Sequence, residues 1–471
     1  MKFLRPTALA AALALAFGTA PAFAESNAEL ANELKALKAR IAELEGKLNA
    51  VPAPPADGST PQWGMTPEQA ADFNRLVVKT EGMEDANETL GFKNLKISGF
   101  IDPTYIYNVR DRRAGFQFLN GITADNGYSY DNGYFGTAML DFQKELEGGT
   151  KWRLTLTPQR GAGSIAEAGS GNFVHEATVS IPMGDLQTRL LVGQMPDWSG
   201  YEQVFSHQNK LVTRGLLLDF TEPTSYTAVG MEIVRGEWDI KGAIGNMNAS
   251  KEPSGHLSPV LAYRVDYSKG EFAGWGFAGV EGKIPNANDG VLGGTKPMSW
   301  LDLFEADTYF IRGDLTLQGQ VGFGHQKKGA IVPDADGNAQ DLRWFALSGL
   351  AAYKFTPRFE GVVRADWIKD DKNGGGLLGY SGYFDGAGTA GDYHNGIGAS
   401  SSCVPGDTTT SCKGANRGAV SFGVNYLLTR NTTIKAEYRY DFASQPVFYD
   451  VKSGDNKKNN HLLGAQLVTS F

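Results

Sequence analysis

Several features are scarce in the 471-residue sequence, and each absence excludes a class of protein. Two cysteines cannot hold together a disulfide scaffold, and the six histidines show no spacing typical of a zinc site. No run after residue 25 approaches the roughly 20 apolar residues of a membrane-spanning helix. The mean hydropathy of −0.28 also argues against a helical membrane protein. No Gly-X-Y repeat is present, which excludes collagen. We expect no metal and no cofactor.

Glycine and aromatic residues are abundant instead. The chain has 59 glycines, close to twice the average share of roughly 7 %, with 26 Phe, 18 Tyr and 8 Trp. A content of 41 % hydrophobic residues argues against disorder throughout the chain. The formal net charge is −8, and an acidic chain gives no basis for binding nucleic acid. Composition alone is therefore typical of a soluble protein of two or three domains.

The first 24 residues have the pattern of an export signal. Lys2 and Arg5 give a positive start, residues 7–17 form a short apolar run, and residues 22–24 (Ala-Phe-Ala) are a small-x-small cleavage site. The alternative is a retained membrane anchor, for which the apolar run is too short. We therefore assign residues 1–24 to a signal peptide.

Residues 25–51 show a heptad pattern typical of a coiled coil. Opposite charges fall at facing flanking positions, Glu33 with Lys38 and Arg40 with Glu45, which favours parallel self-association. The alternative is a lone amphipathic helix on the domain surface. We expect a short stalk that assists a larger trimer interface. The apolar residues recur at alternating spacings of four and three: Leu30, Leu34, Leu37, Ile41, Leu44, Leu48 and Val51.

A linker and a second helical segment follow the stalk. Residues 52–64 are rich in proline and form a semi-rigid spacer. Thr66, followed by proline, is suited to cap a helix, which is predicted to run to about Lys79. We assign residues 65–94 to a periplasmic helix and lead-in, and residues 95–471 to the main domain.

From residue 95 onward the dominant period of the sequence is two. In the clearest segment, Ile434 and Tyr438 share one side, and Lys435 and Arg439 share the other. Such alternation marks a strand with one apolar face and one wet face. Sixteen strands are predicted near 95–109, 134–146, 150–160, 172–182, 186–196, 225–235, 237–247, 258–268, 273–283, 303–313, 315–325, 342–355, 359–369, 418–429, 433–443 and 461–471.

The connections between these strands alternate strictly between short turns and long loops, of which 370–417 is the longest. An even number of strands with short turns at one end and long loops at the other is typical of an outer-membrane barrel. The physical reason is that backbone polar groups in lipid must be paired, and only a closed sheet has no edge. We predict an all-β fold, a 16-stranded antiparallel up-and-down transmembrane β-barrel with a short N-terminal helical coiled-coil stalk.

The last strand ends in an aromatic residue, Phe471. Leu467, Ala465 and Leu463 stand at alternate positions before it, and Thr469 departs from the apolar pattern. This ending resembles the signal by which outer-membrane barrels are recognised for assembly. The barrel assembly machinery is therefore an expected partner through Phe471.

The whole mature chain resembles a bacterial porin. Val192-Gly-Gln-Met-Pro196, followed by Gly200-Tyr-Glu202, Asn209, Pro223 and Gly230, resembles the strand–loop–strand segment of porin-like families in Gram-negative bacteria. Residues 95–107 are similar to the first strand of an uncharacterised betaproteobacterial porin-like family. The stalk is similar to that of sugar-specific porins with a periplasmic coiled coil. The resemblance implies a passive diffusion channel for small polar or charged solutes, and a homotrimer.

Charged strand residues are expected to point into the lumen, because lysine or arginine facing lipid at the midplane costs roughly 2–4 kcal/mol. Mixed signs in the lumen would orient an ion or polar solute in a transverse field. The alternative for each residue is a routine solvated wall position. Ten inward acids against eight bases do not decide between cation and anion preference. The bases are Lys151, Arg153, Arg189, Lys241, Arg264, Arg364, Lys435 and Arg439, and the acids are Asp141, Glu145, Glu176, Glu232, Asp239, Asp266, Glu360, Asp366, Glu437 and Asp441.

Residues 197–224 are too long and too apolar for a simple external loop. One interpretation folds the loop into the barrel as a constriction, with Lys210 and Arg214 on the pore axis and His207 nearby. The other places its apolar residues against a neighbouring subunit. The sequence leaves both open.

Two loop segments carry other candidate chemistry. Cys403 and Cys412 are predicted to form a disulfide after export. Residues 334–341 have the oxygen density of a calcium loop, but their glycine is at the fourth position instead of the sixth. A solvated acidic loop is the alternative there.

These observations predict a protein of the Gram-negative outer membrane with its stalk in the periplasm. Expected partners are membrane lipid, lipopolysaccharide, further copies of the chain and, through the stalk, the cell wall. One alternative is a barrel-anchored tethering or adhesion protein. Another is an outer-membrane hydrolase, but no G-x-S-x-G motif is present and Ser206-His207 is an isolated pair. We therefore do not expect an enzyme.

Overall fold

We describe the fold from a computed structural model of the chain. The description covers residues 66–89, 91–110, 112–118, 136–157, 173–247, 259–285, 298–328, 341–370, 415–446 and 448–471. The signal peptide, the predicted coiled coil and the linker lie outside these residues. The chain divides into two compact units with the boundary between Lys93 and Asn94, and each is described by itself.

The first unit contains helix α3 (Pro67–Thr89). Its start is a capping box, in which the Gln69 N–H donates to Thr66 Oγ1 at 3.2 Å and the Thr66 N–H donates to Gln69 Oε1 at 3.0 Å. The helix runs ten residues beyond the predicted end at Lys79. It passes through Gly82 because the good helix formers that follow, Met83 and Glu84 among them, offset the roughly 1 kcal/mol that glycine costs. In the described part of the chain, no helix is long and apolar enough to cross a membrane.

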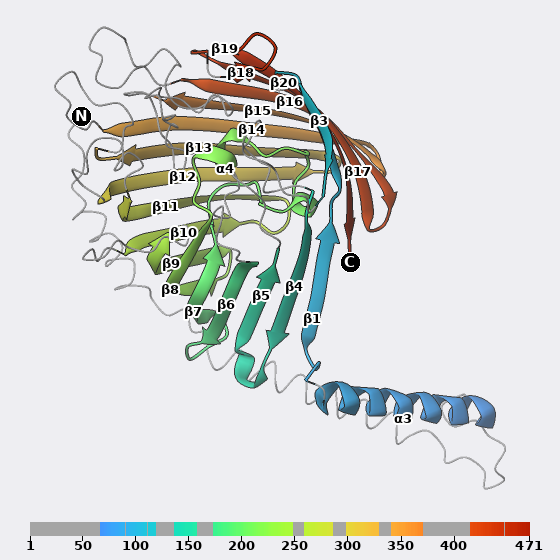
Figure 1. The fold of residues 1–471 in the computed structure, drawn as a ribbon. Helices are drawn as coiled ribbons and strands as arrows, with labels where there is room; N and C mark the ends of the chain where they lie inside the picture. Colours follow the sequence, from blue (N-terminus) through green and yellow to red (C-terminus); the bar gives the residue numbers. More distant parts are fainter. Residues whose placement is uncertain are drawn as a thin grey trace. The chain divides into compact units, whose positions relative to one another are not determined.

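The second unit is an antiparallel sheet that winds round into a closed barrel (Figure 1). Short 3₁₀ turns η3 (Glu147–Gly149) and η4 (Ser206–Gln208) and helix α4 (Leu216–Phe220) interrupt the strand order. The strands are β1 (Leu95–Ile101), β2 (Thr104–Asn108), β3 (Arg113–Gln117), β4 (Ala138–Glu145), β5 (Lys151–Leu156), β6 (Val174–Pro182), β7 (Thr188–Pro196), β8 (Ser225–Arg235), β9 (Trp238–Met247), β10 (Val260–Ser268), β11 (Ala273–Pro285), β12 (Met298–Arg312), β13 (Leu315–Gln326), β14 (Leu342–Thr356), β15 (Phe359–Asp370), β16 (Arg417–Thr429), β17 (Thr432–Ala443), β18 (Phe448–Asp450), β19 (Asp455–Lys457) and β20 (Asn459–Ser470).

The described strands of this sheet fill sixteen places in the barrel wall. β1 and β2 are one strand broken at Asp102 and Pro103, because proline has no N–H to donate to the ladder. β4 pairs with β1, and β3 pairs with β2 on the same side of that broken strand. β3 and β4 therefore together occupy one strand position in the barrel wall. The predicted 16-stranded antiparallel barrel is therefore confirmed, with its first two strands each in two pieces.

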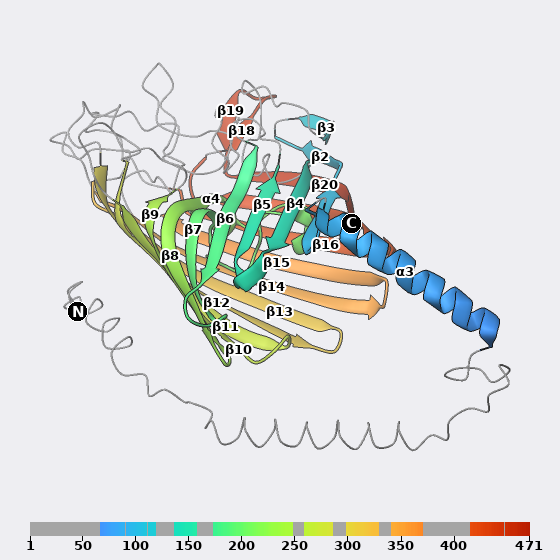
Figure 2. The same ribbon diagram turned by 90° about the horizontal axis from the view of Figure 1, so that it is seen from below.

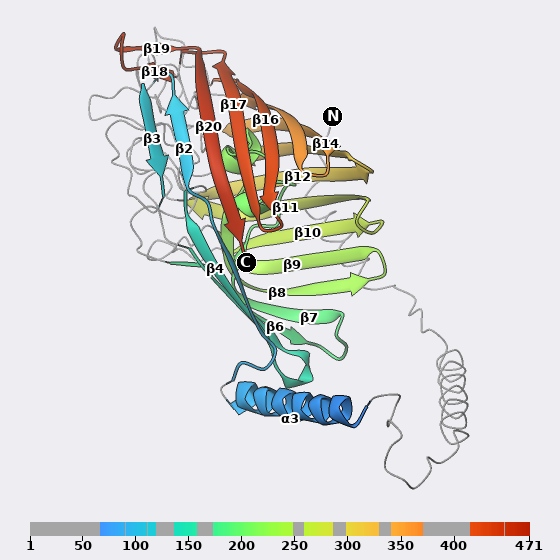
Figure 3. The ribbon, with the colours of Figure 1, turned by 90° about the vertical axis from the view of Figure 1, so that its right-hand side faces the viewer.

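The barrel closes where the last strand meets the first. β20 pairs with β1 from Phe100↔Ser470 and with β2 from Thr104↔Gln466, while its other side pairs with β17 (Figure 3). At the chain end, the Phe471 N–H donates to the Gly99 carbonyl at 3.0 Å and the Gly99 N–H donates back to the Phe471 carbonyl at 3.1 Å. Closure pairs the two strands that would otherwise be open edges.

Side chains of the long strands alternate between the two faces of the wall. On β14, Trp344 and Ala346 are fully buried toward the inside, whereas Phe345 and Leu347 are 38 % and 39 % exposed on the outside. The same apolar outer face continues on β12 and β17 with Phe304 and Ile434. The barrel thus has an apolar exterior, and its buried residues gather on the inner face.

Some elements differ from the predicted ones. β12 begins at Met298 instead of residue 303, because Leu301 and Leu303 keep the two-residue period further back. A small hairpin, β18 with β19, lies in the connection between β17 and β20, which the sequence predicted as a plain loop. Figure 2 shows β18 and β19 together at one end of the barrel.

Gly324 on β13 is required by close packing. A Cβ there would lie 1.9 Å from Cζ2 of the fully buried Trp344, whereas a Cβ at Gly319 on the same strand would lie 3.8 Å from its nearest neighbour. We predict that Gly324→Ala lowers the free energy of unfolding by about 1–3 kcal/mol through overpacking. Thermal unfolding followed by the β-sheet circular dichroism measures it. Gly319→Ala is the matched control, and equal losses for both variants would contradict the packing argument.

Candidate functional site

The segment between β7 and β8, residues 197–224, folds inside the barrel. We call it the inner loop. It contains η4 and α4, and α4 contacts β14 and β15 of the wall (Figure 1). Most of its residues are buried although it is not part of the sheet. Of the two interpretations of this loop, the structure shows the one in which it enters the barrel.

Apolar residues of the inner loop pack against the inner wall. Leu216, Leu217 and Phe220 of α4 are at most 1 % exposed and share a core cluster with Trp344. Nearer the start of the loop, Phe205 packs edge-on against Phe100 of β1, with ring centroids 5.7 Å apart. The apolar residues that made the loop unusual in sequence therefore form the core inside the barrel.

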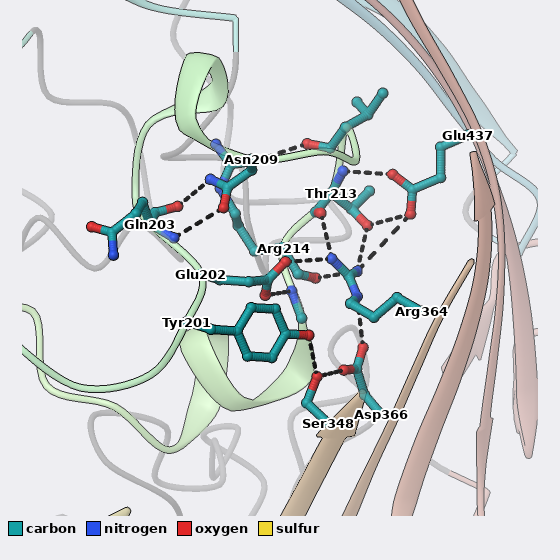
Figure 4. Close-up of polar contacts among 12 residues, drawn as sticks. Tyr201, Glu202, Gln203, Asn209, Thr213, Arg214, Ser348, Arg364, Asp366 and Glu437 are labelled. Carbon is teal, nitrogen blue, oxygen red and sulfur yellow. Dashed lines mark hydrogen bonds and ion pairs between the residues drawn. The ribbon is translucent and has the colours of Figure 1, made fainter. Parts of the chain in front are cut away.

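Arg364 of β15 is the central charge of the contact between loop and wall (Figure 4). Its side chain is fully buried, and it forms ion pairs with Glu202 of the inner loop at 2.6 Å and Asp366 of β15 at 3.0 Å. It also donates to the carbonyls of Thr213 at 3.0 Å and Arg214 at 2.9 Å. One guanidinium thus neutralises a loop acid and satisfies two loop carbonyls.

Inward residues of β17 hold the same part of the loop. Glu437 accepts from the Thr213 N–H at 2.7 Å and from Thr213 Oγ1 at 2.8 Å. Arg439 donates to the Arg214 carbonyl at 2.7 Å. Lys435 Nζ donates to the carbonyls of Ser206 and Asn209, each at 2.6 Å. Alternate residues of one strand therefore bind the loop along its length.

One interpretation of the sequence placed Arg214 on the pore axis, whereas the structure buries it within the inner loop. It is fully buried, and its guanidinium donates to the carbonyls of Val204 at 2.8 Å and Val212 at 3.1 Å. The physical reason is that backbone carbonyls turned inward by the loop need donors, and an arginine within the loop supplies several at once. Lys210 is 27 % exposed and pairs with Glu360 of β15 at 2.7 Å, and His207 is exposed.

The other charged wall residues predicted from the sequence lie on one face of the sheet. Register pairs connect them across neighbouring strands, as in Arg189↔Glu232, Glu232↔Lys241 and Lys241↔Arg264. Most form ion pairs along this face: Arg153 with Asp141 and Glu176, Lys241 with Glu232 and Asp239, Arg264 with Asp266 and Asp307, Arg439 with Asp441, and Lys151 with Glu145 at the short-turn end. Arg189 instead donates to Ser180 Oγ and to the Gly149 carbonyl.

Sequence reasoning missed several residues that hold the loop. Glu202 is the inner-loop partner of Arg364, and Asp102 at the break in the first strand accepts from Ser206 Oγ. Glu305 and Gln320 face inward on β12 and β13. The two-residue alternation of their strands is the signal that could have indicated the inner face for Glu305 and Gln320, but only the folded loop shows that they meet it.

Other predicted features lie outside the described residues. These are the cysteine pair Cys403 and Cys412 and residues 334–340 of the acidic segment 334–341, of which Asp341 is described.

The closed 16-stranded antiparallel barrel is the fold of the outer-membrane porins. The chain is similar to the anion-selective porin from Comamonas acidovorans, with 11 % identity and a TM-score of 0.50, over 80 % of this chain and 99 % of that one. It is also similar to OmpT, an outer membrane protein of Vibrio cholerae, and to the outer membrane channel DcaP of Acinetobacter baumannii. Each has 11 % identity and a TM-score of 0.49, over 80 % of this chain and 97 % of the other. The predicted resemblance to porins is confirmed for the fold.

The chain belongs to the family described as "Protein of unknown function (DUF3138)". The sequence pattern that defines this family matches residues 68–253 and 281–471. A comparison with curated protein sequences finds no match.

Removal of the buried Arg364 side chain is expected to loosen the attachment of the inner loop to the wall. Arg364→Gln leaves Glu202 and Asp366 without their cation inside the barrel, and breaking a buried ion pair costs about 3–5 kcal/mol. We predict a loss of this size in the free energy of unfolding, measured by urea titration. Arg358→Gln, on the exposed turn before the same strand, is the control and should be neutral. A stability equal to wild type for Arg364→Gln would show that the pair does not hold the loop.

Proposed function

We propose that the protein is a porin of the Gram-negative outer membrane, a passive diffusion channel for small polar or charged solutes. The observation that carries the proposal is the inner loop, which occupies part of a closed barrel and is bound to one side of its wall by charged residues. A loop in this position would narrow the lumen and leave part of it open to solutes.

The distribution of side chains over the wall supports this proposal. The outer face exposes large apolar residues such as Phe345, Leu347 and Phe422, which suits contact with lipid. The inner face carries charged groups that remain partly exposed, among them Arg153 at 40 % and Asp266 at 31 %. Charged groups of both signs along a lumen act on permeating solutes through hydrogen bonds and electrostatic attraction.

The proposal includes the surroundings of the barrel. The protein would contact lipid and lipopolysaccharide, assemble as a homotrimer with its stalk in the periplasm, and enter the membrane through recognition of the strand that ends in Phe471. The heptads of residues 25–51 support self-association. The pairing of Phe471 with Gly99 at the barrel seam is compatible with a role of this last strand in closure.

Conductance across a planar lipid bilayer tests the channel function. We expect the purified full-length protein to raise the conductance in discrete steps of uniform size. A properly folded barrel, shown by its circular dichroism, that inserts and never raises the conductance would refute the proposal. The tethering alternative would then be favoured.

Lys210 provides a test of the solute path. It is the partly exposed cation of the inner loop, and Lys210→Gln removes the charge while keeping a donor for Glu360. We predict that the reversal potential in a salt gradient shifts toward cations, because a positive charge beside the path repels them. Lys269→Gln, on an exposed turn, is the control. An unchanged reversal potential would remove Lys210 from the path.

A further inference from the structure

Three carboxyl groups meet where the two ends of the inner loop rejoin the wall. Asp197 is the first residue of the loop, Glu222 is near its end, and Glu305 faces inward from β12. Glu222 is 4 % exposed and Glu305 is fully buried. The site therefore connects both ends of the loop to the wall through acidic groups.

One amide serves two of these carboxyls. Gln320 Nε2 donates to Glu222 Oε1 at 2.6 Å and to Glu305 Oε2 at 2.9 Å. Glu222 Oε2 is buried and has no hydrogen-bond partner within the described residues. Thr221 Oγ1 reaches Glu305 Oε1 at 3.5 Å. Two carboxyls held by one neutral amide do not receive the compensation that two negative charges need.

The third carboxyl is also held by neutral donors. Asp197 accepts from the hydroxyl of Tyr226 on β8 and from the Ser199 N–H at 2.8 Å. The backbone at Gly200, with φ +71°, covers the site, because a Cβ there would lie 2.6 Å from Glu222 Oε1 and 2.8 Å from Gln320 Nε2. A residue with no side chain lets the loop close directly over the acids.

Within the described part of the chain, the three acids lack an ion-pair partner. Among the described residues, no lysine, arginine or histidine forms an ion pair with Asp197, Glu222 or Glu305. The other charged groups nearby are Glu202 of the loop, Asp307 of β12 and Arg264 of β10. Arg264 pairs with Asp307 at 2.5 Å and with Asp266 at 2.6 Å. This contrasts with Glu202, which has Arg364 as its partner.

Burial and like charges act in the same direction on the loop acids. Burial raises the pKa of Glu222 well above its usual value, and the neighbouring Glu305 and Asp197 raise this pKa further. Burial also raises the pKa of Asp197, and this effect outweighs the hydrogen bond from Tyr226, which lowers the pKa. The neutral, protonated forms are therefore the ones that fit inside the closed loop.

We propose that Asp197, Glu222 and Glu305 form a proton-binding site that holds the inner loop to the barrel wall. With its protons bound, the site is a set of neutral carboxyls and the loop stays seated. Loss of the protons places uncompensated negative charges together in a buried space, and they repel one another and draw in water. The stabilisation is thus present at low pH and lost as the pH rises through the raised pKa. A released loop moves from the wall into the lumen and obstructs it.

Hydrogen exchange of the inner-loop amides tests the site without relying on channel activity. For the wild-type full chain, protection factors of residues 215–224, corrected for intrinsic rates, should fall at least about tenfold between about pH 6 and about pH 9. Glu222→Gln mimics the protonated carboxyl, so its protection should stay constant over this range. Glu305→Gln provides a second neutral mimic with the same expectation, and Glu271→Gln, on an exposed turn, should behave as wild type.

Other outcomes overturn the proposal. Constant protection in the wild type, or an equal fall in Glu222→Gln, would show that the acids do not hold the loop through protons. Abolition of the pH dependence by millimolar Mg²⁺ in place of protons would assign the site to a metal ion instead. Bilayer recordings, which rest on the proposed channel function, should show closing events that become more frequent with rising pH in the wild type and in Glu271→Gln, but not in Glu222→Gln or Glu305→Gln. A silent bilayer with the expected exchange pattern would refute the channel and leave the proton site intact.

Discussion

Hydrogen bonding between the last strand and the first is the constraint on which the rest of the structure depends. β20 pairs with both pieces of the first strand, so the pairing of the described strands closes on itself. Because side chains alternate with a period of two, a slip of one residue at this seam would turn the side chains of the slipped strand to the other face. The fixed register is what places Arg364, Glu437 and Lys435 on the side where the inner loop lies.

The inner loop packs against the inner face of the wall, and its polar contacts are of two kinds. Toward β15 and β17, loop acids and carbonyls meet cations, as Glu202 meets Arg364. Toward β12 and β13, the loop acid Glu222 meets another acid and an amide. In the first kind, the guanidinium groups of Arg364 and Arg439 stay charged at ordinary pH. The second depends on protons, so the two sides of the same loop differ in what holds them.

Much of the wall was predictable from the sequence, because the determinant of each strand is local. The two-residue alternation in segments such as 433–443 predicted where the strands lie. The alternation of short turns with long loops predicted that neighbouring strands in the sequence pair in the sheet. The break at Pro103 was not predicted, since the apolar period continues through it, and the pairing of β3 is set by contact with β2 across the sheet. The loop's apolar content indicated burial, but two burial sites fitted it equally well.

The sequence by itself determined the fold class, the strand order and which wall residues share a face, since these follow from periodicity within each strand. Only the tertiary structure decided the roles of the loop residues. Arg214 looked like a free cation and is a buried donor to its own loop, while Glu305 passed unnoticed and faces the loop's end. The reason is that an irregular segment has no repeating period, so the partners of its side chains are fixed by the distant strands against which it folds.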